Sequence, residues 1–158
     1  MEIRVGIGYD AHALEAGVPL VLGGVAIDHP RGLAGHSDGD VVTHALIDAV
    51  LVAANLGDIG SHFPPGDDRF RGASSLGLLR AAYAEVRGAG WELVNADCVL
   101  VGEEPRIGGT RDEMSERLAD ALGVDSTLVA IRATTTDGLG FTGRGEGLAA
   151  QAVALLRR

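Results

Sequence analysis

Ile3-Arg4-Val5-Gly6-Ile7-Gly8-Tyr9 alternates apolar residues with others, which is the pattern of a half-buried β-strand. A second strand is expected at residues 18–25, closed by Gly23-Gly24. Asp40 then stands where a helix N-cap is expected, and residues 41–55 form a mostly apolar stretch. Because apolar residues surround much of its axis, this helix should be well buried. The first third of the chain therefore predicts two strands followed by a core helix.

The rest of the chain continues with helices and strands in mixed order. A helix is expected at 110–122, with Thr110 as N-cap and Glu113 in the capping-box position. The final segment, 145–156, is rich in small apolar residues and fits either a strand or a helix. The other expected elements are a loop at 61–71, a helix at 74–88, and strands at 91–101 and 129–134. This order predicts one domain over residues 1–158, an α+β two-layer sandwich in which a mixed β-sheet carries helices on one face.

Composition and charge exclude several classes of protein. Hydrophobic residues make up 46% of the 158 positions and the mean hydropathy is +0.19, which argues against disorder. No apolar run reaches the roughly 20 residues that span a bilayer, and no signal peptide is expected, because Met1-Glu2 leads straight into a strand. The single cysteine, Cys98, indicates a reducing compartment, and we expect a cytoplasmic protein. The net charge of -9 argues against a nucleic-acid partner, and a phosphorylated ligand would need local cations or metal ions.

Three side chains form a candidate metal site. Asp10 and His12 are two residues apart at the end of a strand, so their side chains lie on one side of it. His44 lies in the first turns of the expected core helix, where both ring nitrogens need partners. Two imidazoles and one carboxylate are ligands that zinc accepts, and three protein ligands with one open position are typical of catalytic zinc. The alternative is a surface turn with a hydrogen-bonded helix histidine; His29 and His62 are interpreted as exposed loop residues.

Two further segments have the composition of phosphate-binding loops. His36-Ser37-Asp38-Gly39-Asp40 places donors just before a helix N-terminus, which favours anions. Thr134-Thr135-Thr136-Asp137-Gly138 places hydroxyl groups and a carboxylate at a strand end, where they suit phosphate oxygens and Mg²⁺. Simple N-capping by Asp38 or Asp40 and a threonine-rich strand end are the alternatives.

A set of motifs along the whole chain resembles one enzyme family. The motifs are Gly8-Tyr9-Asp10-Ala11-His12, His36-Ser37-Asp38-Gly39-Asp40, Gly57-Asp58-Ile59-Gly60, Phe63-Pro64, Ala133-Thr134-Thr135-Thr136 and Gly140-Phe141-Thr142-Gly143-Arg144-Gly145-Glu146-Gly147. Together they resemble the 2-C-methyl-D-erythritol 2,4-cyclodiphosphate synthases, the cyclising enzymes of the non-mevalonate isoprenoid pathway. The combination is highly specific, although no single motif is.

The resemblance implies a reaction and an assembly. The substrate would be 4-diphosphocytidyl-2-C-methyl-D-erythritol 2-phosphate, and the products would be the cyclic diphosphate and CMP. The enzyme would be a homotrimer with active sites between neighbouring subunits. Asp10, His12 and His44 would bind zinc, and a magnesium or manganese ion on the diphosphate would meet Asp137. His36 and Thr135 would stabilise the transition state.

The resemblance also implies a set of substrate-binding residues. They are Asp10, His12, His36, Ser37, Asp58, Ile59, Gly60, Phe63, Pro64, Pro65, Gly66, Asp67, Gly102, Glu103, Glu104, Pro105, Arg106, Ile107, Gly108, Thr134, Thr135, Thr136, Asp137, Phe141 and Arg144. Phe141, Arg144 and Glu146 match residues around a cavity on the trimer axis, which would either hold an isoprenoid phosphate or simply pack the trimer. The chain departs from the family at Asp137, where glutamate is frequent, and at Pro65, where aspartate is common.

The chemistry of such a cyclisation fits these residues. The nucleophile is a phosphate of the substrate, which carries close to two negative charges at pH 7 because its second pKa is about 6, so no general base is needed. A metal-dependent phosphodiesterase or phosphatase that uses water as its nucleophile is the first alternative. A non-catalytic trimer that binds a nucleotide or an isoprenoid is the second.

Overall fold

The computed structural model describes all residues, 1–158, and its centre is a five-stranded sheet. The strand order is β4-β1-β7-β5-β6, and β5 and β6 are parallel whereas the other neighbouring strands are antiparallel. A separate two-stranded sheet is formed by β2 and β3. The strands are β1 (Ile3–Ala16), β2 (Leu20–Leu22), β3 (Val25–Ile27), β4 (Arg31–Leu33), β5 (Glu92–Val101), β6 (Val129–Thr134) and β7 (Gly147–Arg157).

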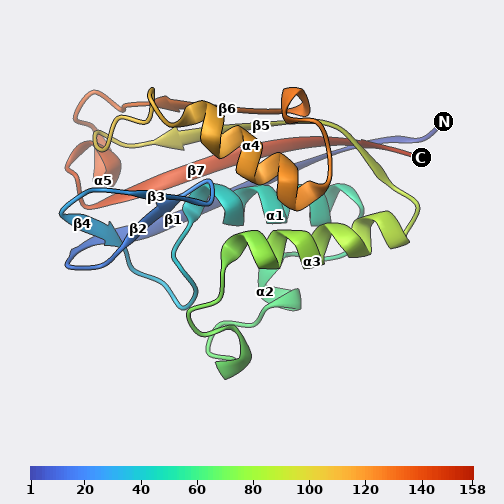
Figure 1. Cartoon of the computed structure of the whole chain (residues 1–158), viewed down its shortest axis with the longest axis horizontal. Coiled ribbons are helices and arrows are strands. Elements are labelled where there is room, and N and C mark those ends of the chain that lie inside the picture. The colour runs from blue at the N-terminus through green and yellow to red at the C-terminus, as the bar shows by residue number, and fades with distance from the viewer.

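Helices cover the sheet and share one hydrophobic core with it. Figure 1 shows α1 and α3 together beneath the sheet, with the two chain termini close to each other. The helices are α1 (Val41–Ala53), α2 (Ile59–His62), α3 (Ser75–Gly88), α4 (Arg111–Leu122) and α5 (Gly140–Gly143), with short 3₁₀ turns η1 (Asp68–Phe70) and η2 (Ser126–Leu128). A mixed sheet packed with helices was the prediction, and the α+β fold is confirmed. No helix is long and apolar enough to cross a membrane.

Glycines in β1 let helix α1 lie directly on the strand. A Cβ atom at Gly8 would stand 1.9 Å from the backbone oxygen of Ala45, and one at Gly6 would stand 2.1 Å from that of Ala49. Real carbon–oxygen contacts cannot be that short, so only glycine permits this approach. The contact places Asp10, which follows on the same face of β1, beside the first turns of α1.

The apolar residues of the same strand face away from the helices. Ile3, Val5, Ile7 and Tyr9 are each more than half exposed in the single chain. The alternation therefore predicted the strand but not its buried face, because the glycine face is the one that packs on α1.

Several element boundaries differ from the sequence predictions. Residues 18–25 are not one strand: Gly23 and Gly24 have φ angles of 57° and 76° and form the turn between β2 and β3. Strand β1 extends to Ala16, so Asp10 and His12 lie within it and not at its end. Helix α1 ends at Ala53, and Asn55 follows in the left-handed conformation with φ 58°.

The capping-box prediction for α4 was wrong. Thr110 makes no side-chain cap hydrogen bond, because its hydroxyl donates to the Ile107 carbonyl (3.1 Å). Glu113 accepts a hydrogen bond from Arg117 (3.0 Å), one turn along the helix. The 61–71 segment also includes short helical turns, since it contains the end of α2 and the turn η1.

The ambiguous C-terminal segment is the central strand β7. It pairs with β1 on one side and β5 on the other. Ala150, Ala152 and Ala154 face the core and are at most 1% exposed. Small side chains there leave room for α1, which crosses the same face.

Candidate metal centre and substrate cavities

Asp10, His12 and His44 meet at the junction of β1 and α1. Their ligand atoms all lie within 4.8 Å of one another. The Asp10 Oδ2 atom is 2.8 Å from His12 Nε2 and 3.1 Å from His44 Nδ1, and the two nitrogens are 3.4 Å apart. The structure therefore brings all three predicted metal ligands together. Two imidazole nitrogens and one carboxylate oxygen at this separation fit a zinc ion that keeps one position open.

The charges of this cluster favour ionised Asp10. Burial raises the pKa of Asp10, but hydrogen bonds from His12 and His44 outweigh burial and lower the pKa to about 2. The hydrogen bond with Asp10 raises the pKa of His12, against the opposing effect of burial. At neutral pH the Asp10 carboxylate is therefore charged and available as a ligand, and a metal ion must displace any proton on His12.

Asp40 fixes the start of the helix that carries His44. Its buried carboxylate accepts four hydrogen bonds, from the backbone N–H groups of Gly23 (2.9 Å), Gly24 (2.7 Å) and Thr43 (3.0 Å) and from the Thr43 hydroxyl (2.7 Å). The predicted N-cap is therefore confirmed, and the same carboxylate ties the β2–β3 turn to α1. Burial raises the pKa of Asp40, against the opposing effect of the hydrogen bonds from Thr43 and Gly24.

A cavity of about 220 Å³ opens beside His12 and His44. It also contains His36 and Ser37 from the loop before α1, Ile59 and Gly60 from α2, and Phe63 and Pro65 from the segment that follows α2. Sequence reasoning missed two apolar residues of its wall, Phe70 and Leu78. These carry no polar signal in the sequence, and only the packing of α3 and η1 brings them to the cavity.

Hydrogen bonds hold the segment of residues 58–67, which lines part of this cavity, to the loop before α1 and to α1 itself. The His36 Nε2–H group donates to the Asp67 carbonyl (2.8 Å). The Ile59 N–H group donates to Asp48 of α1 (2.8 Å), and Asp58 forms a capping box with Ser61. These bonds keep the predicted substrate-contact segment against the metal ligands.

Two histidines predicted to be exposed are half-buried. The His62 ring donates to the Leu56 carbonyl (2.7 Å), and the His29 ring is bonded to the backbone of Arg31 (3.0 Å). Their hydrogen-bonding ring nitrogens anchor loops, which explains why they are partly covered. Neither belongs to the metal cluster.

The threonine-rich segment lines a different cavity, of about 340 Å³. The walls come from the ends of β5 and β6, with residues 102–103, 105–108 and 133–135 and with Arg111, which sequence reasoning missed. The Thr135 hydroxyl donates to Asp137 (3.3 Å), and the Gly138 N–H group donates to Glu103 (3.2 Å). Thr134, Thr135 and Asp137 are exposed, so their oxygens are accessible to a ligand.

The two predicted halves of the site lie apart in one chain. Strand pairing aligns Asp10 with Ala150, Ala150 with Leu100, and Leu100 with Ala133. Asp10 and Ala133 are thus three strand spacings apart, about 14 Å. The cavity beside His44 and the cavity beside Thr135 share no lining residue.

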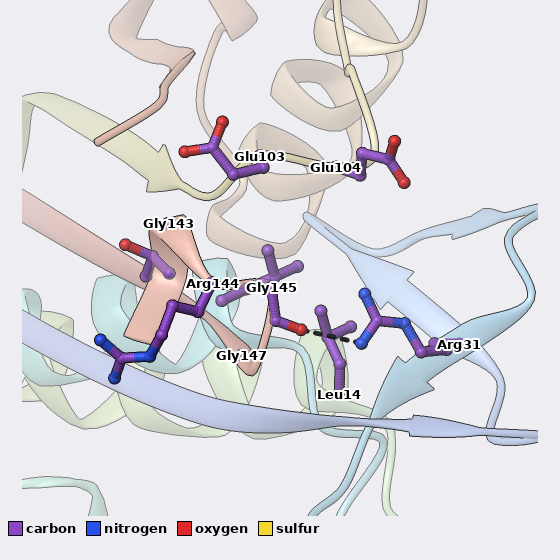
Figure 2. Close-up of a pocket in the computed structure, with 10 residues that line it drawn as sticks. Leu14, Arg31, Glu103, Glu104, Gly143, Arg144, Gly145 and Gly147 are labelled. Atoms are coloured by element: carbon purple, nitrogen blue, oxygen red, sulfur yellow. Dashed lines mark hydrogen bonds between the residues drawn. The ribbon is translucent and has the colours of Figure 1, made fainter. Parts of the chain in front are cut away.

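A third cavity, of about 240 Å³, lies beside the loop that contains Arg144. Figure 2 shows Arg31 reaching from β4 to the Gly145 carbonyl, while the Arg144 side chain points away from Arg31. That hydrogen bond is 2.8 Å long, and Arg144 pairs instead with Glu146 (2.9 Å). Arg31 therefore anchors this loop to the sheet. The cavity contains Glu103 and Glu104 but none of the three metal ligands.

A mixed sheet packed with helices and three converging side chains that could hold a metal ion define an α+β protein with a candidate metal centre. The chain belongs to the YgbB family, which matches residues 3–157. A relative from Moorella thermoacetica, named 2-C-methyl-D-erythritol 2,4-cyclodiphosphate synthase, is 58% identical over 98% of this chain and 94% of its own length.

Two solved structures are similar over nearly the whole chain. The bifunctional IspDF of Campylobacter jejuni is 42% identical with a TM-score of 0.94, covering 98% of this chain and 42% of that longer protein. The CDP complex of IspF from Plasmodium falciparum is 29% identical with a TM-score of 0.86, covering 98% of this chain and 95% of that one. The family suggested by the sequence motifs is thereby confirmed.

Proposed function

We propose that this protein converts 4-diphosphocytidyl-2-C-methyl-D-erythritol 2-phosphate to 2-C-methyl-D-erythritol 2,4-cyclodiphosphate and CMP. The observation that carries the proposal is the convergence of Asp10, His12 and His44 beside an open cavity, in a chain 58% identical to a named synthase of this kind. In the reaction, an oxygen of the 2-phosphate bonds to the erythritol-side phosphorus of the diphosphate. The bond from that phosphorus to the phosphate of CMP breaks, and CMP leaves.

The side chains would act by holding two anionic phosphates together. Asp10, His12 and His44 would hold zinc, which when bound supplies positive charge to a diphosphate oxygen. His36, fixed by the Asp67 carbonyl, and the Thr135 hydroxyl would stabilise charge in the transition state. Since the 2-phosphate is already ionised near pH 7, with a second pKa of about 6, no side chain has to remove a proton.

Asp137 is the proposed residue for a magnesium or manganese ion on the substrate. Its backbone has a φ of 52°, so the loop turns sharply at this position and the carboxylate stands beside Thr135. Magnesium commonly takes one or two carboxylates together with substrate phosphates. The shorter side chain, compared with the glutamate frequent in the family, is the main departure at this site.

The cytidine end of the substrate would occupy the 340 Å³ cavity. As the family resemblance implies, residues 102–108 would read the base edge largely through backbone groups, without depending on side-chain identity. The CDP complex of the P. falciparum relative supports a cytidine nucleotide as ligand.

An assay of CMP release tests the reaction directly. The protein is incubated with the diphosphocytidyl substrate and Mg²⁺, and the products are separated by ion-exchange chromatography. The expected result is CMP and cyclic diphosphate in equal amounts, because one bond exchange forms both. A chelator should abolish the release, since the two phosphates then repel each other without compensation.

Each alternative gives a distinct product pattern in this assay. A linear product that has incorporated water would identify a hydrolase and contradict the proposed cyclisation. No release of CMP under any metal condition would identify a non-catalytic binding protein.

We further propose that three copies of this chain assemble around their open sheet faces. The exposed fractions of Ile3, Val5, Ile7, Tyr9 and Val153 lie between 40% and 67%, so the single chain presents an apolar sheet face to water. Such a patch is typical of a surface that binds another protein. A trimer would cover the patch. It would also allow the Asp10, His12 and His44 cluster of one chain to meet the threonine-rich segment, residues 134–138, of its neighbour.

Ile7→Asp is expected to dissociate this assembly. A carboxylate in the centre of an apolar interface would lose its hydration, which costs several kcal/mol. Light scattering should then report a mass near the 16.2 kDa of one chain instead of three times that mass, and activity should fall with it. The matched control is Val52→Asp, which changes an exposed valine on α1 and should leave the trimer intact. A trimer that survives Ile7→Asp would exclude this face as the interface.

Phe141, Arg144 and Glu146 are proposed to lie around the axis of this trimer. Phe141 is 38% exposed, and the Arg144–Glu146 pair is also exposed in the single chain. We assign them a packing role in the assembly. An axial cavity lined by Arg144 would suit an isoprenoid phosphate, because the guanidinium group binds phosphate oxygens.

A further inference from the structure

The far side of the His44 ring contacts a pair of residues that the metal site itself does not explain. While Nδ1 faces Asp10, Nε2 lies 2.8 Å from the hydroxyl oxygen of Ser75 and 3.0 Å from that of Ser37. Ser75 is the first residue of α3, 31 positions along the chain, and it is fully buried.

Asp38 receives both polar groups of Ser75. The Ser75 hydroxyl is hydrogen-bonded to Asp38 Oδ1, and the Ser75 N–H group donates to Oδ2 (2.9 Å). The Asp40 N–H group also donates to Oδ1 (3.1 Å). Asp38 thus serves the N-terminus of α3, not that of α1, where Asp40 is the cap.

The direction of these hydrogen bonds follows from which groups can donate. An ionised carboxylate only accepts, so the Ser75 hydroxyl must donate its proton to Asp38. The Ser75 oxygen can then only accept from His44, so His44 Nε2 carries a proton. Nδ1 faces Asp10 and His12, and in the ion-free chain it can donate a proton to Asp10; a metal ion that displaces this proton would bind the Nδ1 lone pair.

We propose that Ser75 and Asp38 are positioning residues, which hold His44 in the Nε2-protonated form so that Nδ1 is ready to bind the metal. The inference rests on the proposed metal site and deepens it. Histidine ligands of metals generally need such a partner to fix tautomer and ring orientation. Here the partner is the Ser75 hydroxyl, whose own proton is donated to the Asp38 carboxylate.

Zinc affinity and ring tautomer provide readouts that do not depend on catalysis. Affinity is measured by competition with a chromophoric chelator, and the protonation of each His44 ring nitrogen is read from long-range ¹H–¹⁵N NMR correlations in zinc-loaded and ion-free protein. The wild type should show protonated Nε2. Ser75→Ala should show a mixture of tautomers and bind Zn²⁺ about 10- to 100-fold more weakly. Ser37 remains as a weaker partner in that variant, so binding should not vanish.

Asp38→Asn tests the direction of the hydrogen bonds from His44 to Ser75 and from Ser75 to Asp38, with almost no change in side-chain size. At the Oδ1 position the side-chain NH₂ group would donate to the Ser75 oxygen and lose the bond from the Asp40 N–H group, and the Ser75 proton would then be free to donate to His44. Protonation should therefore shift toward Nδ1, and zinc affinity should fall as in Ser75→Ala. This second variant also keeps the test available if Ser75→Ala does not fold, as judged by circular dichroism.

Ser74→Ala is the matched control. Ser74 is the N-cap of α3 and accepts from the Gly77 N–H group (3.4 Å), so this variant also removes a serine hydroxyl at the same helix start. It should keep zinc affinity within about twofold of wild type, since the histidine partner is untouched. Wild-type zinc affinity and wild-type ring protonation in both Ser75→Ala and Asp38→Asn would overturn only the positioning role of Ser75 and Asp38. A wild-type protein that binds no zinc would overturn both the metal site and the positioning role of Ser75 and Asp38.

Discussion

His44→Ala is expected to lose the bound metal and nearly all activity while the chain stays folded. The ring supplies one of only three ligand atoms, and the remaining two ligands, Asp10 and His12, would bind zinc only weakly. Alanine suits the helix interior, so α1 itself should persist. Elemental analysis should fall from about one zinc per chain to near zero, and kcat should fall by on the order of 10²–10³-fold or more.

The control for this variant removes a histidine outside the cluster. His29→Ala deletes a half-buried ring that bonds to the Arg31 backbone and does not reach the metal ligands. It should retain stoichiometric zinc and cyclising activity. Stoichiometric zinc in folded His44→Ala protein would show that the metal is bound elsewhere.

Gly8→Ala is expected to destabilise the fold strongly. The new Cβ would meet the Ala45 backbone oxygen at 1.9 Å and the Ala49 nitrogen at 2.9 Å. Backbone atoms of a packed helix cannot rotate away, so α1 would have to move off the strand. We expect the free energy of unfolding to fall by at least about 3 kcal/mol, with loss of zinc because His44 moves with the helix.

Gly88→Ala is the matched control for added volume. Nothing lies within 4 Å of the Cβ position of Gly88, and its φ is not in the left-handed range. Its stability should be unchanged or higher by up to about 1 kcal/mol, because alanine suits a helix better than glycine. Denaturant titrations at equal protein concentration compare the two variants. A Gly8→Ala protein as stable as wild type would disprove the proposed contact between strand and helix.

Local sequence patterns predicted the type of most elements but not the state of the C-terminal segment. Alanine is the best helix former, and Ala149, Ala150, Ala152 and Ala154 therefore left strand and helix equally open. The segment is a strand because β1 and β5 both pair with it and because α1 needs small residues beneath it. These are contacts with distant parts of the chain, which a local pattern does not contain.

The polarity of β1 shows the same limit. Alternation correctly indicated a strand, and it placed Ile3, Val5, Ile7 and Tyr9 on one face. Apolar residues usually mark the buried face, yet here the helix packs on the glycines and the apolar face is left open. Sequence alone cannot tell a face that packs within the chain from one that packs on another copy.

For the site, the sequence by itself determined the ligand types and the same-face spacing of Asp10 and His12, and its combined motifs identified the family. Only the tertiary structure decided that His44 Nδ1 lies 3.1 Å from Asp10, that Ser75 stands behind the ring, and that the threonine segment lies three strands away. Spacing along a strand is fixed by backbone geometry, which is local. Strand order, register and the position of a helix on a sheet depend on contacts between distant segments, and the packing of the whole core selects them.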